Sequence, residues 1–90
     1  MIIKRTNSMG LQYNLESLSD NLTAIYHAGK SMILEVSLDE INQAWYNWQM
    51  KGFMIQEAFP RLTPEEREFL LTGITPDEWK KIFSGEENTE

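Results

Sequence analysis

Only a few residues of this 90-residue chain carry side chains that could take part in catalysis. His27 is the single histidine, and to act as a general base it would need an orienting carboxylate and a nucleophile or water nearby. Asp20 precedes His27 by seven positions, which would place both on one face if this stretch were helical. That spacing is too weak to indicate a catalytic pair, and an exposed histidine in a hairpin explains His27 better.

The carboxylates have a structural explanation. Four of them fall in the first turns of predicted helices, where the helix dipole favours negative charge; they are Glu65, Glu66, Asp77 and Glu78. The chain has no Asp-x-Asp-x-Asp-Gly calcium loop and no glycine-rich loop that would hold phosphate. It also lacks cysteine, which excludes disulfides, thiolate metal sites and cysteine nucleophiles. We therefore expect a protein that is not an enzyme and has no catalytic, metal-binding or cofactor-binding site.

The elements that would position these side chains are clearest between residues 62 and 85, where a twelve-residue pattern occurs twice. Leu-Thr-Pro-Glu-Glu-Arg-Glu-Phe-Leu-Leu-Thr-Gly is followed directly by Ile-Thr-Pro-Asp-Glu-Trp-Lys-Lys-Ile-Phe-Ser-Gly. Each copy predicts a short helix with a threonine N-cap, a proline at the first helical position, a glutamate that completes a capping box and a glycine stop. These residues are Thr63, Pro64, Glu66 and Gly73, then Thr75, Pro76, Glu78 and Gly85.

A longer helix is predicted upstream of the repeats. Ser37 opens another capping box, and the helix runs to about Lys51 with Gly52 as its stop. Residues 53–59 predict a further turn and a half of helix, which Pro60 ends. The apolar face of the longer helix carries Leu38, Ile41, Ala44, Trp45 and Trp48.

The first third of the chain has two interpretations. The apolar residues of the stretch 15–28 follow a helical spacing, but the stretch is rich in Ser, Asn, Asp and Thr, which are weak in helix interiors. Residues 23–27 and 32–36 can instead form the two strands of a hairpin, which we favour slightly. The sequence therefore predicts a mainly α fold with a small N-terminal β element, in which a long central helix is followed by short capped C-terminal helices.

We expect this compact helical domain to be a single globular unit over residues 1–85, because the chain has no linker and no break in composition. Residues 1–36 would form its strand or hairpin part, and residues 37–85 its helical part. The acidic residues 86–90 are predicted to be a disordered tail.

The formal net charge of −6 is unevenly distributed. The charges of residues 1–36 cancel, so the whole excess of acidic groups lies in residues 37–90. Such a surface repels phosphate backbones, and we expect no direct binding of nucleic acid. We also expect no membrane insertion, since no stretch approaches the roughly 18 apolar residues of a membrane span. Together with the lack of cysteine, these features predict a cytoplasmic protein.

One long string of the sequence resembles a known family. Residues 55–79 read Ile-Gln-Glu-Ala-Phe-Pro-Arg-Leu-Thr-Pro-Glu-Glu-Arg-Glu-Phe-Leu-Leu-Thr-Gly-Ile-Thr-Pro-Asp-Glu-Trp, with Ile82 and Phe83 close behind. This string is similar to a family of short, uncharacterised proteins of bacteriophages and prophages, and the similarity covers roughly residues 33–85. It implies a phage setting in a bacterial host cell and no mechanism. Residues 1–32 lie outside the resemblance.

These observations favour a small acidic phage or prophage protein that binds another protein, with inhibition of a host or defence factor as one role. Tyr46 and Met50 lie on a different face of the central helix, where they either cover neighbouring elements or form an exposed patch for a partner. Aromatic side chains dominate binding energy at interfaces. The candidate contact residues are Trp45, Tyr46, Trp48, Met50, Gln56 and Glu57.

Three alternatives remain open. A phage structural or assembly accessory would self-associate through Trp45 or Tyr46 as a homo-oligomer. A small-molecule sponge would hold its ligand in aromatic sites between subunits. An acidic mimic of nucleic acid would bind in a salt-sensitive way, although acidity for solubility alone explains the same residues. The mimic would use Glu65, Glu66, Glu68, Asp77, Glu78, Glu86 and Glu87.

Overall fold

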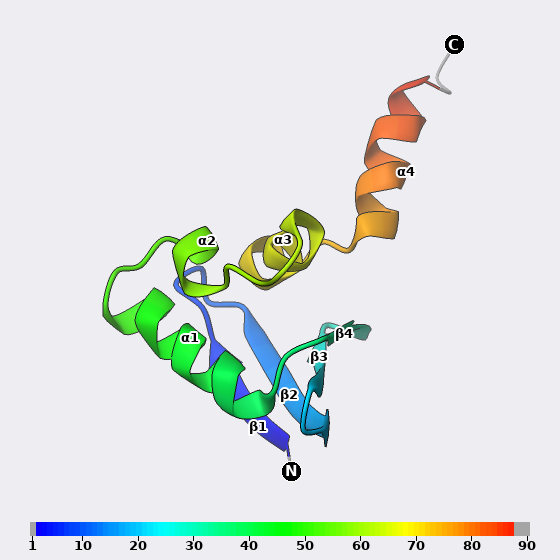
Figure 1. Cartoon of the computed structure of the whole chain (residues 1–90). Helices are drawn as coiled ribbons and strands as arrows, with labels where there is room; N and C mark the ends of the chain where they lie inside the picture. Colours follow the sequence, from blue (N-terminus) through cyan, green and yellow to red (C-terminus); the bar gives the residue numbers. More distant parts are fainter. Residues whose placement is uncertain (1, 88–90) are drawn as a thin grey trace.

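The computed structural model describes residues 2–87, with side chains described as far as residue 82. Four strands come first and form one sheet (Figure 1). They are β1 (Ile2–Thr6), β2 (Gln12–Ser19), β3 (Leu22–His27) and β4 (Lys30–Leu34). The helices that follow are α1 (Leu38–Met50), α2 (Ile55–Ala58), α3 (Pro64–Thr72) and α4 (Pro76–Glu87). The prediction of a mainly α fold with a long central helix is wrong, because a four-stranded sheet occupies most of the first 34 residues and the helices are short.

The sheet is an antiparallel meander in the order β1-β2-β3-β4. The predicted hairpin is formed by β3 and β4, but its second strand spans Lys30–Leu34 and not residues 32–36, because the turn consists only of Ala28 and Gly29. Both residues have a positive φ, 51° and 80°, which a two-residue turn needs if it is to follow the twist of its strands. The ladder between β2 and β3 shifts register between Ser17 and Ser19. The alternative of a helix over residues 15–28 is therefore wrong.

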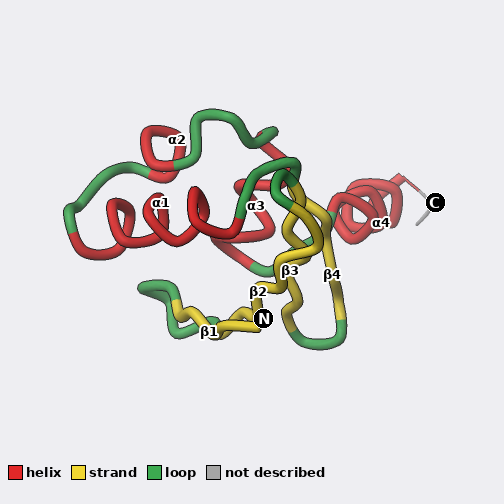
Figure 2. The backbone as a smooth tube through the Cα atoms, turned by 60° about the horizontal axis from the view of Figure 1, so that its bottom comes forward, coloured by secondary structure: helices red, strands yellow, loops and turns green. Residues whose placement is uncertain are grey.

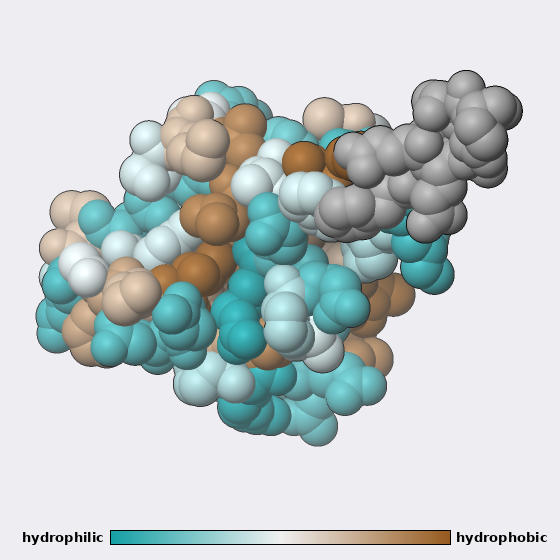
Figure 3. Space-filling view, turned by 90° about the horizontal axis from the view of Figure 1, so that it is seen from above, coloured by the Kyte–Doolittle hydropathy of each residue, from teal (hydrophilic) through white to brown (hydrophobic). Residues whose placement is uncertain are grey.

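One face of the sheet carries the helices. Figures 1 and 2 show α1, α2 and α3 together on the same side of the strands. Successive side chains of a strand point to opposite faces. On the helical side, Tyr13, Leu15, Ile25 and Leu34 are each at most 1% exposed and form the centre of the hydrophobic core with residues from the helices. Seen from above, hydrophobic side chains form a band across a mostly hydrophilic surface (Figure 3).

Two polar side chains join the sheet to the backbone of α3. Asn7, in the loop between β1 and β2, donates from Nδ2 to the carbonyl of Leu70 at 2.9 Å, and its Oδ1 accepts from two backbone N–H groups of its own loop. The Tyr13 hydroxyl donates to the carbonyl of Phe69 at 2.6 Å. Burial raises the pKa of Tyr13 to about 12. Because buried polar groups need partners, these bonds fix how α3 lies on the sheet.

The capping boxes of the tandem helices are confirmed. In α3, Oγ1 of Thr63 accepts from the N–H of Glu66 at 3.1 Å, and the Glu66 carboxylate accepts from the N–H of Thr63 at 2.9 Å. In α4, Thr75 and Glu78 make the same two bonds, at 3.2 and 2.9 Å. Gly73 ends α3 with a φ of 76°, as predicted. These signals act within one helical turn, so tertiary packing does not override them.

The capping box predicted for α1 is only half formed. Oγ of Ser37 accepts from the N–H of Glu40 at 3.1 Å. The Glu40 carboxylate instead accepts from Arg61 at 2.8 and 2.9 Å. Glu40 therefore connects α1 to the loop before α3.

Lys30 holds the start of α4 against the sheet. Its Nζ donates to the carbonyl of Gly73 and lies 3.1 Å from the Glu78 carboxylate. The pKa of Glu78 is lowered, first by the bond from the backbone N–H of Thr75 and then by Lys30. The N-terminus of α4 is thus connected to both β4 and the end of α3.

Beyond this anchor, α4 is directed away from the rest of the molecule (Figure 1). The molecule measures 47 × 28 × 23 Å as a result, and Ile82 of α4 is 47% exposed. A compact helical domain was expected, so α4 departs from the prediction. Gly85 was predicted to end this helix but lies inside it. The predicted acidic tail, 86–90, begins within α4, and residues 88–90 lie outside the described residues.

Candidate functional site

The two tryptophans among the predicted contact residues face the core. Trp45 is 3% exposed, and its ring contacts Tyr13, Trp48 and Phe59 edge to face at centroid distances of 5.6, 5.3 and 6.3 Å. Its indole N–H donates to the carbonyl of Thr6 at 3.1 Å. Trp48 is half-buried and also contacts Phe59, at 5.9 Å. Trp45 therefore stabilises the packing of α1 on the sheet, and Trp48 covers that contact.

An apolar patch covers the C-terminal part of α1 and the loop that follows. Tyr46 and Met50, one helical turn apart, are 50% and 72% exposed. Phe53 and Met54, in the loop, are 42% and 58% exposed. We call these four residues the α1 patch. Helical spacing predicted the exposure of Tyr46 and Met50 but not that of Phe53 and Met54, because residues 53–59 were predicted to be helical and α2 begins only at Ile55.

The loop that carries Phe53 and Met54 has a fixed path. Gly52 turns the chain at the end of α1 with a φ of 78°, and the N–H of Phe53 donates to the carbonyl of Asn47 at 3.1 Å. The N–H of Met54 donates to the Glu57 carboxylate at 2.9 Å. Glu57, predicted to contact a partner, thus helps to begin α2. These bonds restrain the loop backbone, which lowers the entropy that binding at the patch would cost.

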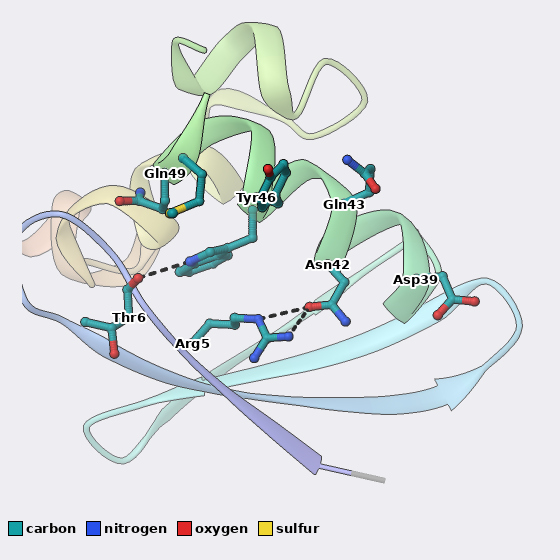
Figure 4. Close-up of a pocket in the computed structure, with 9 residues that line it drawn as sticks. Arg5, Thr6, Asp39, Asn42, Gln43, Tyr46 and Gln49 are labelled. Atoms are coloured by element: carbon teal, nitrogen blue, oxygen red, sulfur yellow. Dashed lines mark hydrogen bonds between the residues drawn. The ribbon is translucent and has the colours of Figure 1, made fainter. Parts of the chain in front are cut away.

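A hollow of about 490 Å³ adjoins the patch between β1 and α1 (Figure 4). The guanidinium of Arg5 crosses this space and donates from Nε and Nη2 to Oδ1 of Asn42 at 2.9 and 2.6 Å. Its Nη1 donates to the carbonyl of Lys4 at 2.7 Å. Gln56, another predicted contact residue, is exposed on α2 and does not line the hollow. The lining residues are Arg5, Thr6, Asp39, Asn42, Gln43, Trp45, Tyr46, Gln49 and Met50.

The lining of the hollow combines apolar and amide groups. Gln49 contributes an Nε2 that is buried and has no hydrogen-bond partner among the described residues. An unmet donor of this kind costs about 1–3 kcal/mol. Amide groups of this kind bind the carbonyl and N–H groups of a peptide backbone. Apolar contact and backbone recognition are therefore both available here.

His27 has a structural environment. Its Nδ1 lies 2.8 Å from the carbonyl of Gln12, and its ring stacks on Tyr13 at a centroid distance of 4.7 Å. A Cβ built on Gly73 would lie 2.7 Å from the ring. Asp20 precedes β3 and His27 ends it, so the strand separates them. Among the described residues, no group of three or more His, Asp or Glu could hold a metal ion.

In the part of the chain that the structure describes, no helix has the length and apolar character needed to cross a membrane. Comparisons of the chain with protein-family models, with curated protein sequences and with solved structures find no match.

Proposed function

We propose that this protein is a non-enzymatic binding domain that docks on another protein through the α1 patch and the adjoining hollow. The observation that carries the proposal is the exposure of four large apolar side chains within nine positions of the chain. Tyr46, Met50, Phe53 and Met54 are between 42% and 72% exposed. Contiguous exposed apolar groups with a polar surround are typical of sites of protein interaction.

The chemistry of the patch suits a protein segment with apolar anchors. Methionine side chains are flexible and adapt to varied surfaces, while Tyr46 offers an apolar ring with a polar end. Burial of one such half-exposed side chain is worth about 1 kcal/mol, from roughly 25 cal/mol per Å² of apolar surface. Amide side chains around the hollow can bond the backbone of the docked segment.

The acidic residues support the mimic of nucleic acid less well. Two of the carboxylates that a mimic would present already accept hydrogen bonds within the chain, Glu66 from Thr63 and Glu78 from Thr75 and Lys30. They act as helix caps, which accounts for their positions. A partner held by apolar anchors is therefore the better proposal.

The resemblance of residues 33–85 to short phage proteins supports a setting in the cytoplasm of an infected bacterium. The partner would then be a host or phage protein. A host enzyme or defence factor that the phage inhibits fits this setting.

Affinity capture of the tagged full chain from a bacterial lysate at high salt tests the proposal. We expect one stoichiometric protein to be retained, and the double variant Tyr46→Ser/Met50→Ser to bind it on the order of 30-fold more weakly, from about 2 kcal/mol of lost apolar burial. The matched control, Ile2→Ser/Leu18→Ser, changes two side chains of similar exposure, 59% and 47%, on the sheet and should bind normally. Equal loss in both variants, or no retained protein, would contradict the proposal.

A further inference from the structure

The two edges of the sheet differ in how their backbone groups are used. In an antiparallel ladder, alternate residues direct their N–H and C=O groups towards the neighbouring strand and away from it. The bond from the N–H of Asn7 to the carbonyl of Leu11 sets this alternation for β1, so the carbonyls of Lys4 and Thr6 face outwards. Both carbonyls accept a hydrogen bond from a side chain: the Lys4 carbonyl from the guanidinium of Arg5, and the Thr6 carbonyl from the indole of Trp45.

The outer edge of β4 is open. The two-residue turn makes His27 and Lys30 a hydrogen-bonded pair, so the backbone N–H and C=O of Lys30 and Met32 point towards β3. The backbone N–H and C=O groups of Ser31 and Ile33 therefore point away from the sheet. No hydrogen bond of the described residues engages these four groups. The side chain of Ile33 is 59% exposed.

This edge also lacks the features that usually protect an edge strand. Residues 30–34 read Lys-Ser-Met-Ile-Leu, with no proline, and the ladder to β3 has no bulge. A lysine on an edge strand can prevent pairing with another chain through its charge, but the ammonium group of Lys30 instead donates to the carbonyl of Gly73 and the carboxylate of Glu78. An apolar, uncovered strand with free backbone groups is a template for a second strand.

We propose that two copies of this chain pair through β4, in antiparallel orientation, and join their sheets into one continuous sheet. The register centred on Met32 uses every free group: Ser31 of each copy exchanges two hydrogen bonds with Ile33 of the other. The exposed side chains of Ile33 then lie diagonally across the two-fold axis, within reach of each other. A strand that is complementary to itself in this way suits an isologous dimer.

The position of α4 fits this arrangement. Both Figure 1 and Figure 2 show α4 leaving the molecule on the side of the sheet where β4 lies. Ile82 lines a hollow of about 400 Å³ between α4, the end of α3 and Lys30, the first residue of β4. The apolar side chain of Ile82, 47% exposed, therefore lies on the side from which a second copy would join the sheet.

The mass of the full chain in solution tests the pairing. Sedimentation over a range of protein concentrations should show a species of twice the 10.5 kDa of one chain. Because each copy carries a net charge of −6, the dimer should become more populated as salt screens the repulsion. A monomer at all concentrations and salt levels would overturn the proposal.

Two variants of matched exposure locate the interface. Ile2 and Ile33 are both 59% exposed and stand at opposite ends of one row across the outer face of the sheet, with Glu16 and Ala24 between them. We expect Ile33→Lys to be a folded monomer by circular dichroism and sedimentation, and Ile2→Lys to remain a dimer. Dissociation by both variants alike would overturn the assignment to β4.

Amide hydrogen exchange gives a second, residue-level measurement on the unmodified chain. The amides of Ser31 and Ile33 should be protected in the dimer. In Ile33→Pro, a change tolerated by an edge strand whose N–H faces outwards, position 33 has no amide and the amide of Ser31 should lose its protection. The amide of Lys4, which faces outwards from β1, should exchange quickly in both. Fast exchange at Ser31 and Ile33 in the wild-type chain would contradict the pairing.

Discussion

Replacement of Gly73 by alanine should destabilise the fold by about 2–4 kcal/mol. The left-handed conformation at this position, with a φ of 76°, costs a residue with a Cβ roughly 1 kcal/mol. The added Cβ would also lie 2.7 Å from Cδ2 and Nε2 of His27. The ring must then move from its stack on Tyr13 and from the carbonyl of Gln12, which adds about 1–3 kcal/mol, as overpacking of a filled site does.

Thermal unfolding followed by circular dichroism measures this effect. A loss of 2–4 kcal/mol lowers Tm by on the order of 10–25 °C in a domain of this size. Gly52→Ala is the matched control, because Gly52 has nearly the same φ, 78°, but a Cβ there meets no atom within 4 Å. It should lose only the backbone contribution, roughly 1 kcal/mol.

A double-mutant cycle separates the two contributions. In a His27→Ala background, Gly73→Ala should cost no more than Gly52→Ala, because the contact with the ring no longer exists. Equal destabilisation by Gly73→Ala and Gly52→Ala in the wild-type background would refute the contact with His27. An unchanged Tm for Gly73→Ala would refute the left-handed end of α3 as well.

The further predictions concern three polar sites: Tyr13, Glu78 with Lys30, and Asn7. The pKa of Tyr13 rises from 10.0 to about 12 on folding, so its contribution to stability should be complete below pH 10 and be lost towards pH 12, which phenolate absorbance and urea unfolding can follow. Tyr13→Phe should cost about 1–2 kcal/mol, since the carbonyl of Phe69 loses its donor. The pKa of Glu78 is lowered by the bond from the backbone N–H of Thr75 and then by Lys30. Its contribution to the stability of the fold is therefore present above the pKa of the unfolded carboxyl and is lost as the pH falls through the folded pKa. Lys30→Met should weaken this pH dependence of Tm. Asn7→Ala should lower the urea midpoint by the equivalent of about 2 kcal/mol without changing the slope of the transition.

The local signals of the sequence were sufficient for the starts of α3 and α4 and for the end of α3. Thr63 with Glu66 and Thr75 with Glu78 bond to each other across three positions, so their pattern alone predicted their contacts. The prediction that Gly85 ends α4 was wrong, because a glycine permits a helix to end but does not force it to.

The sheet was harder to predict because its order comes from distant partners. Tyr13 and Leu15 alternate with Asn14 and Glu16 in β2, which is the pattern of a half-buried strand, but the apolar residues from Leu15 onwards also fit a helical spacing. The polar composition around them favours a strand only once β1 and β3 pair on either side. The predicted fold class therefore underestimated the β content.

The candidate site shows a similar division. Spacing placed Tyr46 and Met50 on a face separate from Trp45, and the structure leaves that face exposed. The exposure of Phe53 and Met54 depends on the turn at Gly52. Arg5, which lines the hollow opposite α1, comes from β1, 37 positions before Asn42 in the chain. Neither follows from helical spacing.

The bonds between the sheet and α3 also determine when the fold can be completed during synthesis. Asn7 and Leu70 are 63 positions apart, and Tyr13 and Phe69 are 56 apart. The part of the apolar face that α3 covers therefore stays exposed until residue 70 has left the ribosome, and until then other chains or chaperones can bind the strands there. The chain should fold in one late, cooperative step and not strand by strand as it emerges.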